Sequence, residues 1–222
     1  MLKSYPASQP RRVAEKRRKA LQERRLLREK AIEESINVWQ KEIVPDWRVV
    51  NKNSDLRRLW WRGIPTKLRA EMWERAVGNP LALRKGKSFM LHLATSILTR
   101  FHPADHYRAC LSRAKRALST GVFPEATFSQ IEEDISSTLP SIHIFNRDSG
   151  PLYAELKDML CAWVISRSDE GLDYTQGAAK MAAMMLINMP APQGFNVMKN
   201  LLERHCLRSF YGGNAARDDV SA

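Results

Sequence analysis

Cysteine is scarce in this sequence, and the usual spacings of catalytic and metal-binding residues are missing. The 222 residues include three cysteines, Cys110, Cys161 and Cys206, which lie far apart and form no C-x-x-C pair. Neither a disulfide framework nor a thiolate metal site is expected, and a reducing compartment fits best. The five histidines show no H-E-x-x-H spacing, and no serine or cysteine stands in a nucleophile-elbow sequence. These absences argue against a metalloenzyme and against a covalent hydrolase.

Long apolar runs are also missing. The most apolar stretch, Ala178 to Met189, contains Lys180 and ends before Pro190, well short of the roughly 20 apolar residues that a membrane-spanning helix needs. Met1 to Pro10 lacks the apolar core of a signal peptide. We therefore expect a cytoplasmic location, with any membrane contact made at the surface.

Acidic residues are few near the N-terminus, and the formal net charge of the chain is +12. Between Arg11 and Lys30, ten lysines and arginines face only Glu15, Glu23 and Glu29. Such a segment attracts an anionic membrane surface or nucleic acid. Aromatics that would stack on bases are absent, and its first half lacks an apolar stripe for insertion into lipid. A solvated charged helix is the expected state, and membrane adhesion through residues 11–30 is favoured over nucleic acid as its alternative role.

The same segment is predicted to be a long helix from about Arg11 to Lys41, because helix-forming residues dominate and no glycine or proline interrupts it. In its second half, apolar residues follow the spacing of one helical stripe: Ile32, Ile36, Trp39 and Ile43. The helical pattern ends around residues 45–53. We therefore expect a basic helical arm and linker over 1–53, a folded domain over 54–211 and a disordered tail over 212–222.

Helical patterns fill the rest of the chain, without a convincing strand pattern, so the fold class is all-α. Pro65, Pro103 and Pro151 suit first helical positions. Ser129 and Glu132 have the spacing of a capping box, which predicts a helix from about Gln130 to Thr138. The stretch Ala178 to Met189, apolar nearly all round, is predicted to be a central buried helix.

Three further segments form a recognisable set through their residues, their order and their spacing along the chain. The first is Leu59-Trp60-Trp61-Arg62-Gly63-Ile64-Pro65 with Arg69-x-x-x-Trp73, the second is Ile131-x-x-Asp134-x-x-Ser137-Thr138-Leu139-Pro140, and the third is Tyr174-Thr175-Gln176-Gly177. Together they resemble the TBC family of Rab GTPase-activating proteins over roughly Leu56 to Tyr211. The resemblance implies a multi-helix TBC-like domain with a role in vesicle trafficking and a Rab-type small GTPase as partner.

The family's mechanism places an arginine and a glutamine in the nucleotide site of the partner GTPase. The resemblance assigns the glutamine to Gln176, whereas Ser137 stands where the family has its arginine. An arginine finger contributes about 10³ to 10⁵ in rate, and a hydroxyl cannot replace a cation. We therefore expect reduced activity. No cofactor of its own is expected, because GTP and Mg²⁺ belong to the partner GTPase.

Other residues take expected roles from the same resemblance. Asp134, Tyr174 and Asp173 are expected at the partner-binding face, although Asp134 has a local capping or surface pairing role as its alternative. Asp173 replaces a family glycine and adds negative charge beside a phosphate site. Arg69 and Trp73, one helical turn apart, are expected to be structural.

Arg147 is a candidate substitute for the missing arginine, because its glycine-containing loop is close in sequence to Ser137. The alternative for Arg147 is a solvated side chain paired with Asp148. For Gln176 the alternative is a helix N-terminal residue bonded to the backbone.

Family domains continue for several helices beyond the position of Ala222, so the resemblance implies a domain truncated at its C-terminal end. In that case the apolar residues of one late segment are expected to lack partners: Phe195, Val197, Met198, Leu201 and Leu202. Two functions other than activation therefore remain open. One is a catalytically inactive TBC-like binding module, and the other is a basic membrane-surface adaptor.

Overall fold

The structure, a computed structural model, describes residues 9–46, 49–50, 52–78, 104–204 and 207–211. These residues form helices and turns, without a β-strand among them, which confirms the predicted all-α class. The chain divides into two compact units, Met1–Arg69 and Ala70–Ala222. Pro103 and the predicted tail over 212–222 lie outside the described residues, and the predicted domain limits stay a prediction.

The first unit is built around one long helix. α1 runs over Gln9–Val38 and continues into a π-helical turn, Trp39–Ile43, as the composition of this segment predicted. α2 follows over Ser54–Trp61 and begins at Asn53, whose Oδ1 accepts hydrogen bonds from the backbone N–H groups of Asp55 and Leu56. This side-chain cap satisfies donors that the first helical turn leaves unpaired.

Only the last part of the predicted apolar stripe of α1 is buried. Trp39 and Ile43 are fully buried, whereas Ile32 is 47% exposed. The Trp39 ring stacks on Trp60 of α2, with ring centroids 5.5 Å apart and planes 28° apart. The aromatic pair therefore joins the end of α1 to α2, and the rest of α1 up to that point makes no core.

α3 spans Thr66–Val77 and crosses the division between the units. It begins directly after Pro65 and ends before Gly78, whose φ of 66° suits the residue that follows a helix. Near its start, the Arg69 Nε donates a hydrogen bond to the Ile64 carbonyl at 3.0 Å. Arg69 therefore fixes the turn that leads into α3.

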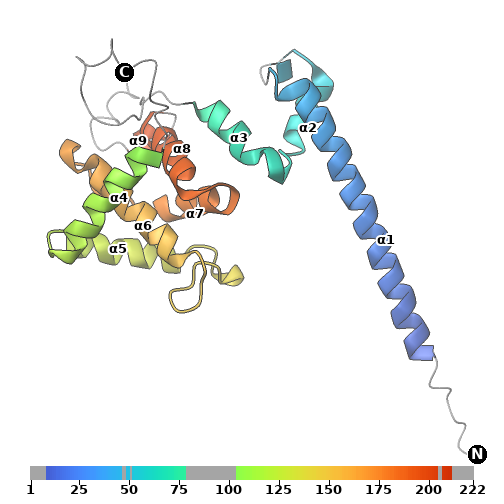
Figure 1. Cartoon of the computed structure of the whole chain (residues 1–222), viewed down its shortest axis with the longest axis horizontal. Coiled ribbons are helices and arrows are strands. Elements are labelled where there is room, and N and C mark those ends of the chain that lie inside the picture. The colour runs from blue at the N-terminus through green and yellow to red at the C-terminus, as the bar shows by residue number, and fades with distance from the viewer. Residues whose placement is uncertain (1–8, 47–48, 51, 79–103, 205–206, 212–222) are drawn as a thin grey trace, which may run out of the picture. The chain divides into compact units, whose positions relative to one another are not determined.

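The second unit is a cluster of helices around α6. Its main helices are α4 (Ala104–Ser119), α5 (Glu125–Ser136), α6 (Tyr153–Arg167), α7 (Ala178–Asn188) and α8 (Ala191–Arg204), and a short α9 (Arg208–Tyr211) follows. α6 packs against α4, α5, α7 and α8, which surround it in Figure 1. Leu156, Met159, Leu160 and Trp163 of α6 are completely buried. Helix α7 is present where its apolar sequence predicted a helix, but α6 takes the central place and one side of α7 is exposed, with Met184 40% and Ile187 42% exposed.

Two further sequence predictions are wrong in this unit. α5 begins at Glu125 after Pro124, so Ser129 lies inside the helix and forms no capping box with Glu132. The extended backbone of Pro124 (φ −60°, ψ 124°) already sets the start of the helix. Second, Phe195, Val197, Met198 and Leu202 are buried in the core of this unit instead of lacking partners. They pack because α8 lies against α4, α6 and α7.

Candidate functional site

The C-terminal end of α5 is closed by two hydroxyl side chains. The Ser137 Oγ donates a hydrogen bond to the Asp134 carbonyl at 2.9 Å, and the Thr138 Oγ1 donates to the same oxygen at 2.7 Å. Leu139 then adopts a left-handed backbone (φ 47°, ψ 51°) and leads into a 3₁₀ turn, Pro140–Ile142. Ser137 itself is exposed. The position expected for an arginine therefore lies on the surface, where a helix ends and the chain turns sharply.

Asp134 is the centre of the site, although only 1% of its surface is exposed. Its Oδ2 accepts hydrogen bonds from the Tyr174 hydroxyl at 2.5 Å, the Gly177 backbone N–H at 2.8 Å and the Ala179 backbone N–H at 3.1 Å. A local surface role for Asp134 is thus wrong, because its partners lie 40 to 45 residues away in sequence. One buried carboxylate oxygen joins α5 to the loop that carries Gln176.

The carboxylate also stabilises the start of α7. Gly177 precedes the first residue of this helix and has φ 93°, a backbone conformation that strains any residue with a Cβ. The N–H groups of Gly177 and Ala179 lie where a helix leaves its first donors unpaired and carries partial positive charge. A negative side chain at this point compensates both effects, which explains why an aspartate can be buried here.

Tyr174 fixes the other end of the loop. Its ring is buried and contacts Trp163 edge to face, with centroids 6.1 Å apart. Burial, followed by the hydrogen bond to Asp134, raises the pKa of Tyr174 well above its usual value of 10.0. The phenol therefore stays protonated and donates to the carboxylate throughout the physiological range. Asp134 and Tyr174 were expected at the partner-binding face, but their burial gives them a positioning role instead.

Gln176 lies between these two anchors and is exposed. No hydrogen bond joins its side chain to another described residue, so the backbone bonding considered as an alternative is not seen in the described part of the chain. Asp173, at the start of the same loop, is exposed as well. Its expected contact with a partner stays a prediction. The structure thus holds Gln176 and Ser137 on two segments that share Asp134 as their common anchor.

Arg147 does not lie with them. Its Nη1 forms an ion pair with the Glu132 Oε2 at 3.1 Å, and the Glu132 Oε1 accepts a hydrogen bond from the Tyr153 hydroxyl at 2.9 Å. Glu132 precedes Asp134 by two residues, which places the two side chains on opposite sides of α5, about 200° apart. The partner of Arg147 is therefore Glu132 and not Asp148, and this ion pair lies on the side of α5 away from the Gln176 loop.

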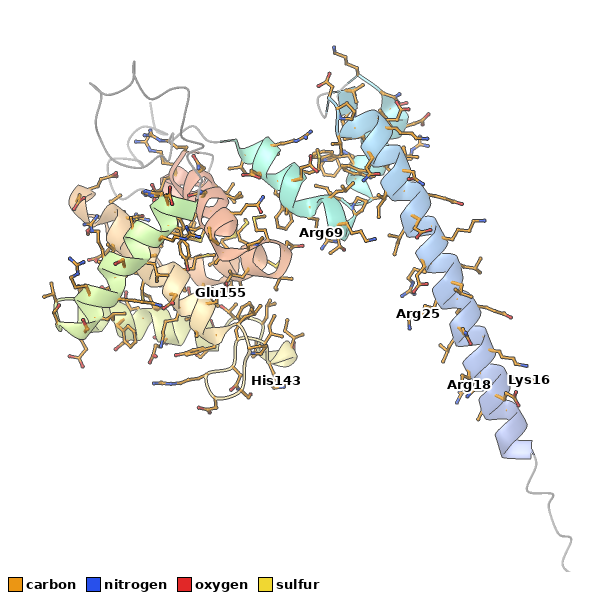
Figure 2. All side chains as sticks on the ribbon, in the orientation of Figure 1. Lys16, Arg18, Arg25, Arg69, His143 and Glu155 are labelled. Carbon is orange, nitrogen blue, oxygen red and sulfur yellow. The ribbon has the colours of Figure 1, made fainter. Side chains whose placement is uncertain are left out.

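A pocket of about 360 Å³ opens on that other side of α5. Its walls come from the end of the helix and from the following loop, and include Glu132, Ser136, Leu139, His143 and Arg147. Gly150 closes the loop, because a Cβ at this position would lie 2.4 Å from the Asn146 backbone nitrogen. His143, labelled in Figure 2, is an exposed residue of this loop. The pocket therefore borders the segment of Ser137 without containing Gln176.

Sequence reasoning missed a group of residues behind the Gln176 loop. Arg167 is 1% exposed, lies over the Trp163 ring at 4.4 Å and donates a hydrogen bond to the Tyr211 carbonyl. Tyr211 in turn packs its ring against Trp163 at 6.2 Å, and its hydroxyl would lie 3.5 Å from a Cβ on Gly177. Trp163 therefore contacts both tyrosines. No local sequence signal identifies such a group, because its members meet only through the packing of α6, α7 and α9.

Neither a membrane span nor a metal cluster is found in the part of the chain that the structure describes. No helix there is both long and apolar enough to cross a bilayer. No group of three or more potential ligands among these residues is arranged to hold a metal ion.

The comparison with known proteins identifies the family of this all-helical unit, in which a buried aspartate anchors the loop of an exposed glutamine. The Rab-GTPase-TBC domain family matches residues 66–216. The chain therefore belongs to this family, as its sequence motifs indicated.

Relatives in several organisms are similar over most of the chain. TBC1 domain family member 12 of Rattus norvegicus is 30% identical over 208 residues, which cover 88% of this chain and 27% of that protein. TBC1 domain family member 14 of Homo sapiens is 31% identical over 214 residues, covering 89% and 28%. A TBC domain-containing protein of Schizosaccharomyces pombe is 31% identical over 176 residues, covering 79% and 34%. The chain thus spans about a third or less of the length of these relatives.

Proposed function

We propose that this chain is a GTPase-activating domain for a Rab-type small GTPase, to which it supplies Gln176 but no arginine from position 137. Membership of the Rab-GTPase-TBC family supports the partner class. The observation that carries the proposal is the anchoring of the Gln176 loop by Asp134, through hydrogen bonds at 2.5, 2.8 and 3.1 Å. That anchor leaves the amide exposed on a fixed backbone, as a side chain inserted into a partner must be.

The chemistry of GTP hydrolysis explains why a fixed glutamine is useful. The attacking water must lie in line with the bond that breaks, and an amide can hold it there by accepting and donating hydrogen bonds. GTP and Mg²⁺ are carried by the partner GTPase. The role of this chain is then to position water at the partner's nucleotide, which requires a rigid loop and an exposed Gln176 side chain.

Ser137 limits the rate that such a site reaches. Negative charge spreads over the γ-phosphoryl oxygens in the transition state, and an arginine finger that neutralises it contributes about 10³ to 10⁵ in rate, or roughly 4 to 7 kcal/mol. The hydroxyl of Ser137 carries no charge and is already bound to the Asp134 carbonyl. Asp173, exposed in the Gln176 loop, adds a negative charge where phosphate must approach. We therefore expect activation well below that of an arginine-bearing domain.

A second candidate function is a binding module that docks on the GTPase without changing its rate. The hydrogen bond from Ser137 to the helix end favours it, since this side chain is committed to α5 and offers nothing to the nucleotide. In either case a Rab-type partner would place the chain in vesicle trafficking, at the cytoplasmic side of a membrane.

Single-turnover GTP hydrolysis by a panel of GTP-loaded Rab proteins tests the proposal. Wild type, Gln176→Ala and Ser137→Arg are compared, with Arg147→Ala as a matched surface control because Arg147 pairs with Glu132 on the far side of α5. We expect weak acceleration by wild type, its loss in Gln176→Ala, a gain of at least tenfold in Ser137→Arg, and no change beyond twofold in Arg147→Ala.

The other outcomes separate the two candidates. Binding to a GTP-loaded Rab without acceleration, together with a gain in Ser137→Arg, would establish the binding module instead. A loss of activity in Arg147→Ala would show that Arg147 supplies the cation after all. Failure of every variant to bind or to accelerate any member of the panel would overturn both functions.

A further inference from the structure

Helix α1 exposes its side chains over most of its length. Every residue from Val13 to Glu34 is exposed, and Figure 2 shows side chains projecting from α1 all along it. This segment lies outside residues 66–216, which the family match covers. Its surface is therefore not explained by the GTPase-directed site.

The charges of α1 are sorted between two sides of the helix. At 3.6 residues per turn, two overlapping rows of positions share one side of the helix: 13, 17, 20, 24, 27 and 31, and 17, 21, 24, 28 and 32. We call this side of the helix the arginine face, because its only charged residues are Arg17, Arg24 and Arg28. Its other members are all apolar: Val13, Ala20, Leu21, Leu27, Ala31 and Ile32.

The acidic residues lie outside this face, together with the lysines and two further arginines: Glu15, Lys16, Arg18, Lys19, Glu23, Arg25, Glu29, Lys30, Glu33 and Glu34. Ion pairs join Lys19 to Glu15 at 3.8 Å, Arg25 to Glu29 at 2.9 Å and Lys30 to Glu34 at 4.0 Å. Within the described residues, no ion pair involves a member of the arginine face. The three arginines of this face are thus available to an external anion.

Four apolar members of the face are large and exposed, two of them in the first half of α1, where no apolar stripe for insertion was expected. Val13 is 59% exposed, Leu21 66%, Leu27 69% and Ile32 47%. A partner that binds only through its negative charge would make no favourable contact with these apolar side chains. A partner with anionic groups above an apolar layer would contact both kinds of residue at once.

We propose that the arginine face of α1 lies on an anionic membrane surface. Guanidinium groups bind phosphate oxygens in pairs of hydrogen bonds and extend upward from an apolar stem, so that Val13, Leu21, Leu27 and Ile32 can enter the boundary between headgroups and acyl chains. The lysine and glutamate side then faces water. This orientation gives both the arginines and the large apolar side chains of the face a matching layer of the bilayer, and it does not depend on the proposed activation of a GTPase.

Two other occupants fit the face less well. A second copy of α1 in a coiled coil would bury the row 13, 17, 20, 24, 27 and 31, which contains Arg17 and Arg24, whereas core positions of a coiled coil are apolar. Single-stranded nucleic acid needs aromatic side chains on which bases stack, and the arginine face has none.

Co-sedimentation of the full chain with lipid vesicles tests the proposal. Vesicles of phosphatidylcholine with roughly a third phosphatidylserine are compared with pure phosphatidylcholine, at low and at physiological salt. The variant Arg17→Gln/Arg24→Gln/Arg28→Gln is compared with Lys16→Gln/Lys19→Gln/Lys30→Gln, which removes the same charge from the other side. Since each basic residue near an anionic surface contributes roughly fivefold in partitioning, we expect about a hundredfold loss in the arginine variant and a much smaller loss in the lysine variant.

Neighbouring leucines provide a control for insertion. Leu27 belongs to the arginine face, whereas Leu26, 58% exposed, lies about 100° away toward the lysine and glutamate side. We expect Leu27→Ser to weaken vesicle binding by several fold and Leu26→Ser to leave it unchanged, with helix content by circular dichroism equal in both.

Equal losses in the two charge variants would overturn the proposal, because net charge alone would then act. Equal losses of vesicle binding in Leu26→Ser and Leu27→Ser would show that the arginine face does not insert its apolar side chains into the bilayer. Absence of binding to the anionic vesicles, or tighter binding to single-stranded RNA that Leu27→Ser does not change, would also overturn it.

Discussion

Asp134 shows what a single residue contributes to this site. Replacing it with alanine leaves the Tyr174 hydroxyl and the N–H groups of Gly177 and Ala179 without their acceptor. Because hydrogen bonds to a charged group contribute about 1.5 to 3 kcal/mol each and are not additive, we expect Asp134→Ala to lower the free energy of unfolding by roughly 3–5 kcal/mol. Urea unfolding followed by circular dichroism measures this loss.

The conservative substitution Asp134→Asn and a substitution at the neighbouring Glu133 supply the controls for Asp134. Asp134→Asn keeps an acceptor oxygen but loses the charge, so its loss is expected to be less than half as large. Glu133→Ala removes a carboxylate that is exposed on the same helix, and we expect a change below about 0.5 kcal/mol. A loss in Asp134→Ala no greater than that in Glu133→Ala would contradict the anchoring role.

The candidate site was only partly predictable from individual residues. The motif around Gln176 placed this residue before an apolar helix, and in the structure Gln176 is exposed just before α7. The burial of Asp134 could not be predicted, because its donors come from a segment 40 to 45 residues away in sequence. Arg147 was close to Ser137 in sequence, yet Glu132 holds it on another side of α5.

At the scale of elements, helix type was predictable and helix limits were less so. Composition alone predicted α1, and the apolar pattern predicted α7. The start of α5 was placed too late, because a Ser–Glu spacing inside a helix is indistinguishable from a capping box until the tertiary structure shows that Pro124 precedes the first turn. Period and composition identify a helix, whereas its first residue depends on competing local signals.

The junction of α1 and α2 depends on the pair of Trp39 and Trp60. Trp39 is completely buried, and its indole N–H has no hydrogen-bond partner in the described part of the chain. We expect Trp39→Ala to destabilise this junction by about 3–5 kcal/mol, because a large cavity replaces the ring. Limited proteolysis should then cut faster between α1 and α2, around residues 44–53.

Phenylalanine provides the matched control at position 39. It keeps most of the aromatic area and removes the unpaired N–H, whose burial is costly. We therefore expect Trp39→Phe to be cut at nearly the wild-type rate. Equal rates for wild type and Trp39→Ala would show that the stacked pair does not hold the two helices together.

At the scale of the whole molecule, buried titratable groups define the pH range in which the second unit is most stable. Burial lowers the pKa of His106, with Lys199 as the next cause. Burial also raises the pKa of Cys161 to about 12 and that of Tyr107 to about 12, in each case with Asp158 as the next cause. The folded chain therefore favours the neutral form of all three groups.

The direction of each pKa shift determines how the stability of the folded chain changes with pH. The contribution of His106 to stability is present above its usual pKa of 6.5 and is lost as the pH falls below that value. The contributions of Cys161 and Tyr107 are present below the usual values of 9.0 and 10.0 and are lost as the pH rises toward 12. In that range the unfolded chain binds fewer protons than the folded chain, so stability falls with pH by about 1.4 kcal/mol per unit for each group.

Urea unfolding at intervals from pH 6 to pH 11 measures this profile. We expect a plateau between about pH 7 and pH 9, and a decline that begins near 9 and steepens above 10 as first cysteine and then tyrosine ionises in the unfolded chain. Cys161→Ala removes one of the groups that titrate first, so its decline between pH 9 and 10 should be shallower than that of wild type at an unchanged m-value. A flat profile up to pH 11, or an equal slope in Cys161→Ala, would mean that these side chains are solvated in the folded chain. Their burial by α6 and α4 would then not persist in solution.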